Sequence, residues 1–185
     1  MGGDRGEPTV ALVRVGSLQP GLLAALGAGL QEVLCCGLVD GGSLDPASAF
    51  DAGRRQHWST PLLHRLEGLR PASADRVLGV TEVDLYIPIL TFVFGEALLG
   101  RPPAIVSTYR LQPTFYGLPP NPALTAERAR REVIHELGHT FGLIHCPNHA
   151  CVMHASRVAD EVDLKGPGPC QSCADALGLA GVRVR

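Results

Sequence analysis

The sequence predicts an α/β sandwich built on a mostly parallel, twisted sheet. Two observations support this fold class: strand-like and helical segments alternate along the chain, and 45% of the 185 residues are hydrophobic. An alternating order of strands and helices is typical of a parallel sheet covered by helices. A chain of this length and hydrophobic content can bury one core, so we expect a single domain.

The elements of the first half follow from the hydrophobic pattern. Residues 9–15 are mostly apolar and predict a buried strand, and residues 20–36 carry apolar side chains at helical spacing. A second strand is expected to begin at residues 36–39, whereas the turn residues of segment 40–52 predict a loop. Capping residues followed by a proline predict a helix over residues 59–69.

The second half continues the alternation. Residues 76–86 predict a third strand with an extended continuation, and residues 91–94 and 104–109 predict two more strands. Residues 113–122 are rich in proline and predict a loop. A helix is expected to begin at Thr125 and to end near Phe141.

This last helix carries a metal-binding pattern, HExxHxxGxxH, formed by His135, Glu136, His139, Gly142 and His145. One helical turn separates the first two histidines, so both can bind one zinc ion while Glu136 serves as general base. A continuing helix would carry His145 away from the metal, but a left-handed Gly142 can end the helix and bring it back. Three histidines leave a fourth position open for an activated water, which is typical of catalytic zinc.

Four cysteines follow in two pairs: Cys146, Cys151, Cys170 and Cys173. Two interpretations stay open, namely two disulfides or one structural zinc bound by all four thiolates. A reducing compartment favours zinc, and the sequence then predicts two zinc ions per chain, one catalytic and one structural. Cys35 and Cys36 are expected to be plain core residues.

These motifs resemble those of the archaemetzincins, a branch of the metzincin zinc metalloproteases. The histidine motif, the Cys-Val-Met sequence at 151–153 and the cysteine pair at 170–173 carry the C-terminal part of the resemblance. Segments 78–86 and 92–97 extend it upstream. The resemblance therefore covers residues 76–176.

The resemblance implies the metzincin form of the sandwich. An upper subdomain (residues 1–141) would hold the sheet and the active-site helix, and a small lower subdomain (residues 142–185) would hold a methionine turn and the four-cysteine zinc site. Met153 would pack beneath the ligands without binding zinc. An antiparallel edge strand at residues 91–97 would bind substrate in extended form, with the candidate contacts Phe92, Val93, Phe94 and Gly95.

We therefore expect a zinc-dependent peptidase that acts on a peptide or protein substrate, with Glu136 as general base and then general acid. Two other classes stay open: a zinc-stabilised binding protein with little or no turnover, and a zinc hydrolase that acts on something other than peptides. The presence of Glu136 favours an enzyme, because a structural zinc site needs no base. Aminopeptidase and endopeptidase action both stay open.

Charge and composition exclude several classes of partner. The net charge of −2 gives no basic surface for nucleic acid and no polybasic patch for membranes. Residues 1–8 lack the basic start and apolar stretch of a signal peptide, and the apolar region 22–39 is too polar to span a membrane. We expect a cytoplasmic monomer.

Overall fold

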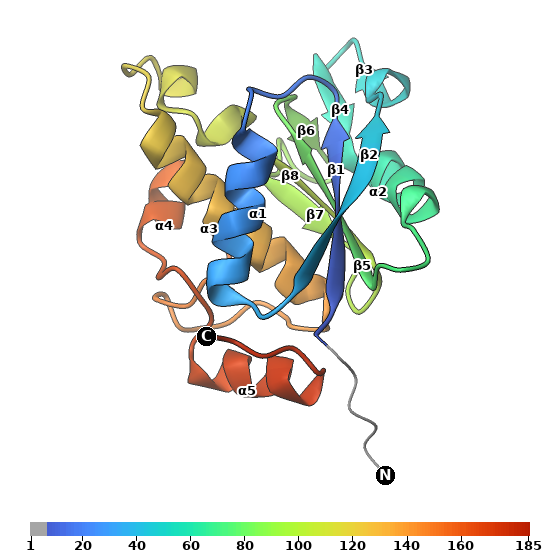
Figure 1. Ribbon diagram of the computed structural model, residues 1–185. Coiled ribbons are helices and arrows are strands. Elements are labelled where there is room, and N and C mark those ends of the chain that lie inside the picture. The colour runs from blue at the N-terminus through green and yellow to red at the C-terminus, as the bar shows by residue number, and fades with distance from the viewer. Residues whose placement is uncertain (1–6) are drawn as a thin grey trace.

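The computed structural model describes residues 7–185 and is built around a five-stranded sheet of order β2-β1-β5-β8-β7 (Figure 1). Four of the strands run parallel, and β7 is antiparallel to its neighbour β8. The expected fold class, a mostly parallel α/β sheet, is confirmed. The strands are β1 (Thr9–Val15), β2 (Gly37–Leu44), β5 (Arg76–Thr81), β7 (Gly95–Ala97) and β8 (Pro103–Ser107).

Helices cover both faces of this sheet. Helices α1 (Leu22–Val33) and α3 (Pro122–Thr140) pack side by side on one face, and α2 (Ser59–Leu69) covers the other (Figure 1). Because successive side chains of a strand point to opposite faces, the strands supply two hydrophobic cores. Leu12 and Val80 pack in the core beneath α1 and α3, whereas Val13 and Val77 pack beneath α2.

A second, three-stranded sheet lies beyond the carboxyl ends of the main strands. Its order is β3-β4-β6, and β4 pairs antiparallel with β3 and parallel with β6. Its strands and the short helices of the loops are β3 (Phe50–Asp51), β4 (Gln56–Trp58), β6 (Leu85–Tyr86), η1 (Ala47–Ala49), η2 (Tyr109–Leu111) and η3 (Pro113–Tyr116). These short elements have no distinct hydrophobic periodicity, and we predicted neither β4 nor β3, which lies in the segment expected to form a loop at residues 40–52.

The chain after α3 forms two further helices, α4 (Ala159–Asp163) beside α3 and α5 (Gln171–Leu179) at the bottom of the view (Figure 1). Both lie in the part expected to form the lower subdomain. Over residues 7–185, no helix combines the length and the apolar character needed to cross a bilayer. Cys35 and Cys36 are buried in the core, as expected.

The loop expected at residues 40–52 is wrong for its first part, because β2 continues to Leu44. The pairing of β2 with β1 shifts register between Leu12 and Arg14, so the glycine pair at 41–42 forms a bulge within the strand instead of a turn. The strand expected at 91–94 is also misplaced, since β7 begins only at Gly95.

Helix α3 begins three residues earlier than expected. Asn121 caps it, because its side-chain oxygen accepts a hydrogen bond from the Leu124 amide at 3.1 Å. Pro122 occupies the first helical position, where a missing N–H costs nothing. The asparagine-proline pair is thus a helix start and does not belong to the preceding loop.

Candidate active site and metal centres

The three motif histidines converge at the C-terminal end of α3. His135 and His139 lie one turn apart on this helix. Their neighbours on the same helix, Val133, Ile134 and Leu137, are buried in the core. One ring nitrogen of each histidine, that of His145 included, lies within 4.8 Å of the others. Core packing therefore fixes the helix that presents the first two side chains.

A Schellman motif ends the helix and returns the chain to the site. The Gly142 amide donates to His139 O at 3.0 Å, and the Leu143 amide donates to Gly138 O at 3.0 Å. Gly142 has φ +95°, the left-handed conformation expected from the sequence. The turn carries His145 back beside His135, with ring centroids 5.3 Å apart.

Hydrogen bonds fix which ring nitrogen of His135 and of His139 faces the site. His135 Nδ1 donates to Val152 O at 2.9 Å, and His139 Nδ1 donates to Leu143 O at 2.7 Å. Burial lowers the pKa of His135 well below its ordinary value and also lowers the pKa of His139, so both rings are neutral near pH 7. Their Nε2 atoms therefore turn unprotonated lone pairs toward each other at 3.1 Å.

Two facing lone pairs repel unless a cation lies between them. Nitrogen ligands about 2.0–2.1 Å from a tetrahedral zinc are roughly 3.3 Å apart, close to the observed separation. The carbonyl partners of Nδ1 are the kind of support that orients metal-binding histidines in proteins. These observations fit a zinc ion held by His135, His139 and His145.

Glu136 lies beside this cluster, and only 6% of the residue is exposed. Burial raises its pKa well above the ordinary value, and the Glu132 carboxylate raises it further. Gly95 of β7 makes room for it, because a Cβ there would lie 2.6 Å from Glu136 Cγ and 2.8 Å from Oε1. Gly95, expected to contact substrate, thus has a packing reason to be glycine.

Met153 is buried directly beneath the end of α3. A Cβ on Gly138 would meet Met153 Sδ at 2.4 Å, so the absence of a side chain lets the thioether pack against the helix between the two histidines. The Met153 carbonyl also accepts a hydrogen bond from the Cys146 amide at 2.9 Å. Met153 thus packs against the helix that carries His135 and His139.

A buried ion pair joins α3 to the segment below it. Lys165 Nζ lies 2.9 Å from Glu132 Oε1, and the two side chains are 1% and 4% exposed. Glu132 is one helical turn before Glu136 and lines the same cleft. The sequence analysis did not identify this pair, since 33 residues separate its members along the chain.

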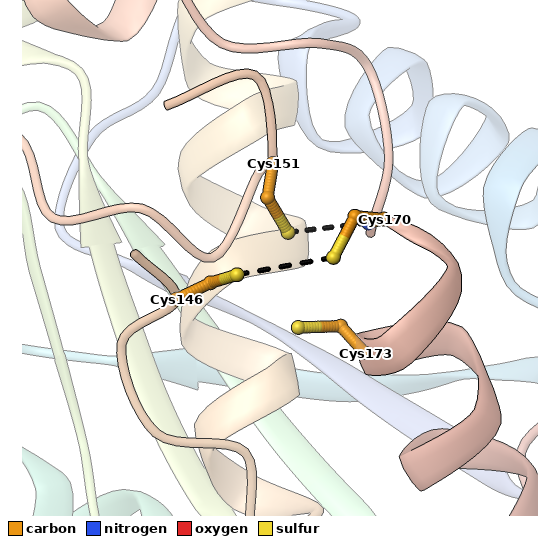
Figure 2. Close-up of side chains that lie close together, drawn as sticks. All are labelled: Cys146, Cys151, Cys170 and Cys173. Atoms are coloured by element: carbon orange, nitrogen blue, oxygen red, sulfur yellow. Dashed lines mark hydrogen bonds between the residues drawn. The ribbon is translucent and has the colours of Figure 1, made fainter. Parts of the chain in front are cut away.

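The four cysteines form a second cluster, with their sulfur atoms within 4.8 Å of one another (Figure 2). Cys146 Sγ and Cys170 Sγ are 3.8 Å apart, and the Cys170 amide donates to Cys151 Sγ at 3.2 Å. Thiolates about 2.3 Å from a tetrahedral zinc are roughly 3.8 Å apart, whereas a disulfide requires about 2.05 Å. The geometry therefore favours zinc over two disulfides.

One thiol of this cluster is primed to ionise. A hydrogen bond from the Cys173 backbone lowers the pKa of Cys170 to about 7. Cys170 is the N-cap of α5, where the helix dipole also favours a negative charge. By contrast, burial raises the pKa of Cys151. A zinc ion would deprotonate all four thiols, because it binds them as thiolates.

A cleft of about 370 Å³ opens beside the histidines. His135, His145 and Glu136 line it, and so do the predicted substrate contacts at residues 92–95. Thr91, which belongs to the strand expected to bind substrate, also lines the cleft. Leu90 before it and the run Ala155, Ser156 and Arg157, which follows Met153, were not anticipated. These residues carry no recognisable motif and are identified only by the fold.

The chain is similar to known proteins over most of its length. The family model of Peptidase family M54 matches residues 44–178. The archaemetzincin of Methanocaldococcus jannaschii is 47% identical over 139 residues, which are 75% of each chain. That of Pyrococcus horikoshii is 48% identical over 130 residues, which are 70% of this chain and 69% of the relative.

Solved structures show the same fold. The archaemetzincin of Methanopyrus kandleri has a TM-score of 0.82 at 36% identity, covering 95% of this chain and 97% of its own. A zinc-dependent peptidase from Methanocorpusculum labreanum has a TM-score of 0.78 at 33% identity, covering 91% and 99%. The fold and the histidine site define a zinc metallopeptidase. Within that class, the chain belongs to the archaemetzincins, Peptidase family M54.

Proposed function

We propose that this metallopeptidase hydrolyses peptide bonds of substrates bound in the cleft, with zinc held by His135, His139 and His145 and with Glu136 as general base and then general acid. The observation that carries the proposal is the convergence of three ring nitrogens beside a buried carboxylate within one cleft. All the candidate ligands come from a single chain, so we expect the monomer to be active.

When bound, zinc supplies Lewis-acid activation of water and of the carbonyl group of the peptide bond to be cleaved. The chain's own residues then handle the proton. Glu136 accepts it on a carboxylate oxygen, and the raised pKa lets the acid hold the proton before it passes to the leaving amine. Because Gly95 packs against Glu136 Cγ and Oε1, the carboxylate has little freedom to turn away from this position.

We propose that the cysteine cluster holds a second zinc with a structural role. It would join the segment that follows the histidine motif to the start of α5, and so hold the lower subdomain (residues 142–185) together beneath the upper one (residues 1–141). Cysteine-bound zinc stabilises small folds by about 10 kcal/mol or more. Thiolates that bind zinc must stay reduced, which supports a cytoplasmic location.

We further propose that the wall at residues 92–95 contacts substrate in extended form. Strand β7, which begins at Gly95, is the last strand of the sheet and runs antiparallel to β8. An edge strand with unpaired backbone groups can add a peptide as one more strand. Phe92 and Phe94 line the cleft beside it and form an edge-to-face pair with ring centroids 5.2 Å apart.

The decisive test is the isosteric change Glu136→Gln, which removes the proton acceptor and leaves every candidate ligand in place. Peptide hydrolysis should fall by about 10²–10⁴-fold, the usual contribution of a general base. Zinc content should not change. The melting temperature should not fall, because the change replaces a buried carboxylate with a neutral amide of the same shape.

Glu127→Gln is the matched control, since Glu127 lies on the same helix but is exposed and pairs with Arg131. It should retain wild-type hydrolysis. Undiminished turnover in Glu136→Gln would remove Glu136 as the base. A wild-type protein with full zinc and no turnover on any peptide would instead favour a zinc-stabilised binding protein.

A further inference from the structure

The cleft wall between β6 and β7 has no regular secondary structure of its own. Only two backbone hydrogen bonds join residues 87–94 to the neighbouring strands: the Val93 amide donates to Leu85 O at 3.0 Å, and Phe94 O accepts from the Ser107 amide at 2.7 Å. Yet Leu90, Thr91 and Phe92 line the cleft, farther along the segment. Other interactions must fix their position.

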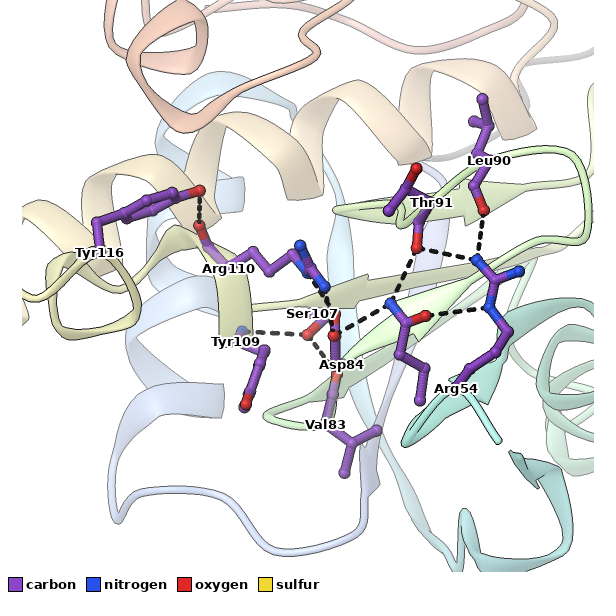
Figure 3. A network of polar contacts seen from close by, with 10 residues as sticks. Arg54, Val83, Asp84, Leu90, Thr91, Ser107, Tyr109, Arg110 and Tyr116 are labelled. Carbon is purple, nitrogen blue, oxygen red and sulfur yellow. Dashed lines mark hydrogen bonds and ion pairs between the residues drawn. The ribbon is translucent and has the colours of Figure 1, made fainter. Parts of the chain in front are cut away.

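Two side chains from outside the cleft bind the backbone of this wall (Figure 3). The buried Gln56 of β4 donates from Nε2 to Thr91 O at 3.0 Å and to Asp84 Oδ2 at 3.1 Å. Arg54 Nη2 donates to Leu90 O at 2.8 Å and to Thr91 O at 3.1 Å, while its Nε donates to Gln56 Oε1 at 3.1 Å. The carbonyls of the wall are thus bound by side chains from the second sheet.

An ion pair extends this network to the side chains of the wall. Arg110 Nε and Nη2 each lie 2.7 Å from an oxygen of Asp84, and the two side chains are only 19% and 11% exposed. The same guanidinium lies over the rings of Phe92 and Phe115, 4.3 and 4.7 Å from their centroids. Tyr116 Oη fixes the Arg110 backbone by donating to its carbonyl at 2.9 Å (Figure 3).

We propose that Gln56, Asp84 and Arg110 are positioning residues for the substrate, a role that rests on the peptidase function proposed above. They act through the carbonyl of Thr91 and the ring of Phe92, and none of the three lines the cleft itself. A wall that contacts the substrate equally in the ground and transition states changes KM and leaves kcat unaltered. Their removal therefore weakens binding of peptides that extend along the wall, without affecting proton transfer at Glu136.

The test is Gln56→Glu, which keeps the shape of the side chain but places an oxygen where the donor faces Thr91 O and Asp84. KM for a peptide that spans the wall should rise about tenfold, the affinity equivalent of one hydrogen bond. The value of kcat should stay within about twofold and zinc content should not change. Amide hydrogen exchange should quicken across residues 87–94.

Gln31→Glu is the matched control, because Gln31 Nε2 also donates to a backbone carbonyl, that of Cys36, away from the cleft. Arg110→Lys tests the network from its other end: lysine keeps the charge but loses both the paired bonds and the flat stacking surface, so KM should rise again. Arg101→Lys, in an exposed pair with Glu67, is its control.

Three results would overturn parts of the proposal, and they are distinguishable. Unchanged hydrogen exchange across residues 87–94 in an active Gln56→Glu enzyme would show that Gln56 does not hold this segment in place, and would leave the peptidase function untouched. A fall in kcat and zinc content together with the rise in KM would show a general structural role. Absence of turnover in the zinc-loaded wild type would overturn the proposed function. Hydrogen exchange in the variants would then still show whether Gln56 holds residues 87–94 in place.

Discussion

Replacing Gly142 with valine tests how the third histidine is placed. Gly142 has φ +95°, and a Cβ there would meet no atom within 4 Å, so the cost of the change is conformational and not steric. A β-branched residue held in this region costs about 1–3 kcal/mol. The chain can avoid this strain by unwinding the turn, which displaces His145.

If the strain falls on the zinc-bound state, zinc affinity should drop by about 5-fold to 150-fold, since about 1.4 kcal/mol corresponds to a factor of ten. Gly117→Val is the control: Gly117 has φ +75°, also without a neighbour within 4 Å, and it ends η3 away from the histidines.

Chelator competition measures zinc affinity, and thermal unfolding measures the loss of stability in both variants. Gly142→Val should weaken zinc binding more than Gly117→Val at a similar loss of stability. Equal zinc affinity in the two variants would show that the left-handed turn does not place His145.

Two further predictions concern the clusters. Replacing Cys170 and Cys173 with serine should remove one zinc ion per chain and lower the melting temperature, while the histidine site keeps part of its zinc. Metal analysis together with disulfide mapping measures this. Unchanged zinc content and cysteines joined in disulfides would contradict the prediction. In the metal-free protein, stability should fall as the pH drops below about 6.5, because burial lowers the folded-state pKa of His135, His139 and His145 and the unfolded chain therefore binds protons first. Urea midpoints that stay constant from pH 8 to pH 5 would refute this.

The parts of the site that could be predicted from the sequence are those set by short-range geometry. The helical repeat alone places His135 and His139 on one face, and the glycine three residues after His139 accounts for the return of His145. Strand β1 was predicted with its observed bounds, since the apolar run of residues 10–13, continued by Val15, suits a strand that is buried on both faces over most of its length.

The parts that could not be predicted depend on contacts between distant residues. The apolar run at 91–94 resembles a strand, but the carbonyl of Thr91 accepts hydrogen bonds from side chains 35 and 37 residues earlier, and the ladder begins only at Gly95. Nothing local in the sequence indicates that Gln56 and Arg110 meet at Asp84. Likewise, the role of Gly95 becomes visible only when Glu136 is seen against it.

The buried pair of Lys165 and Glu132 has a consequence for covalent labelling. Lys165 is the only lysine of the chain, and its ammonium is hidden against α3 with 1% of the side chain exposed. Acylating reagents attack a free amine that reaches water, so the folded protein presents no lysine to them. The rate of acylation at Lys165 therefore reports how readily the segment that holds Lys165 against α3 opens, with no engineered labelling site.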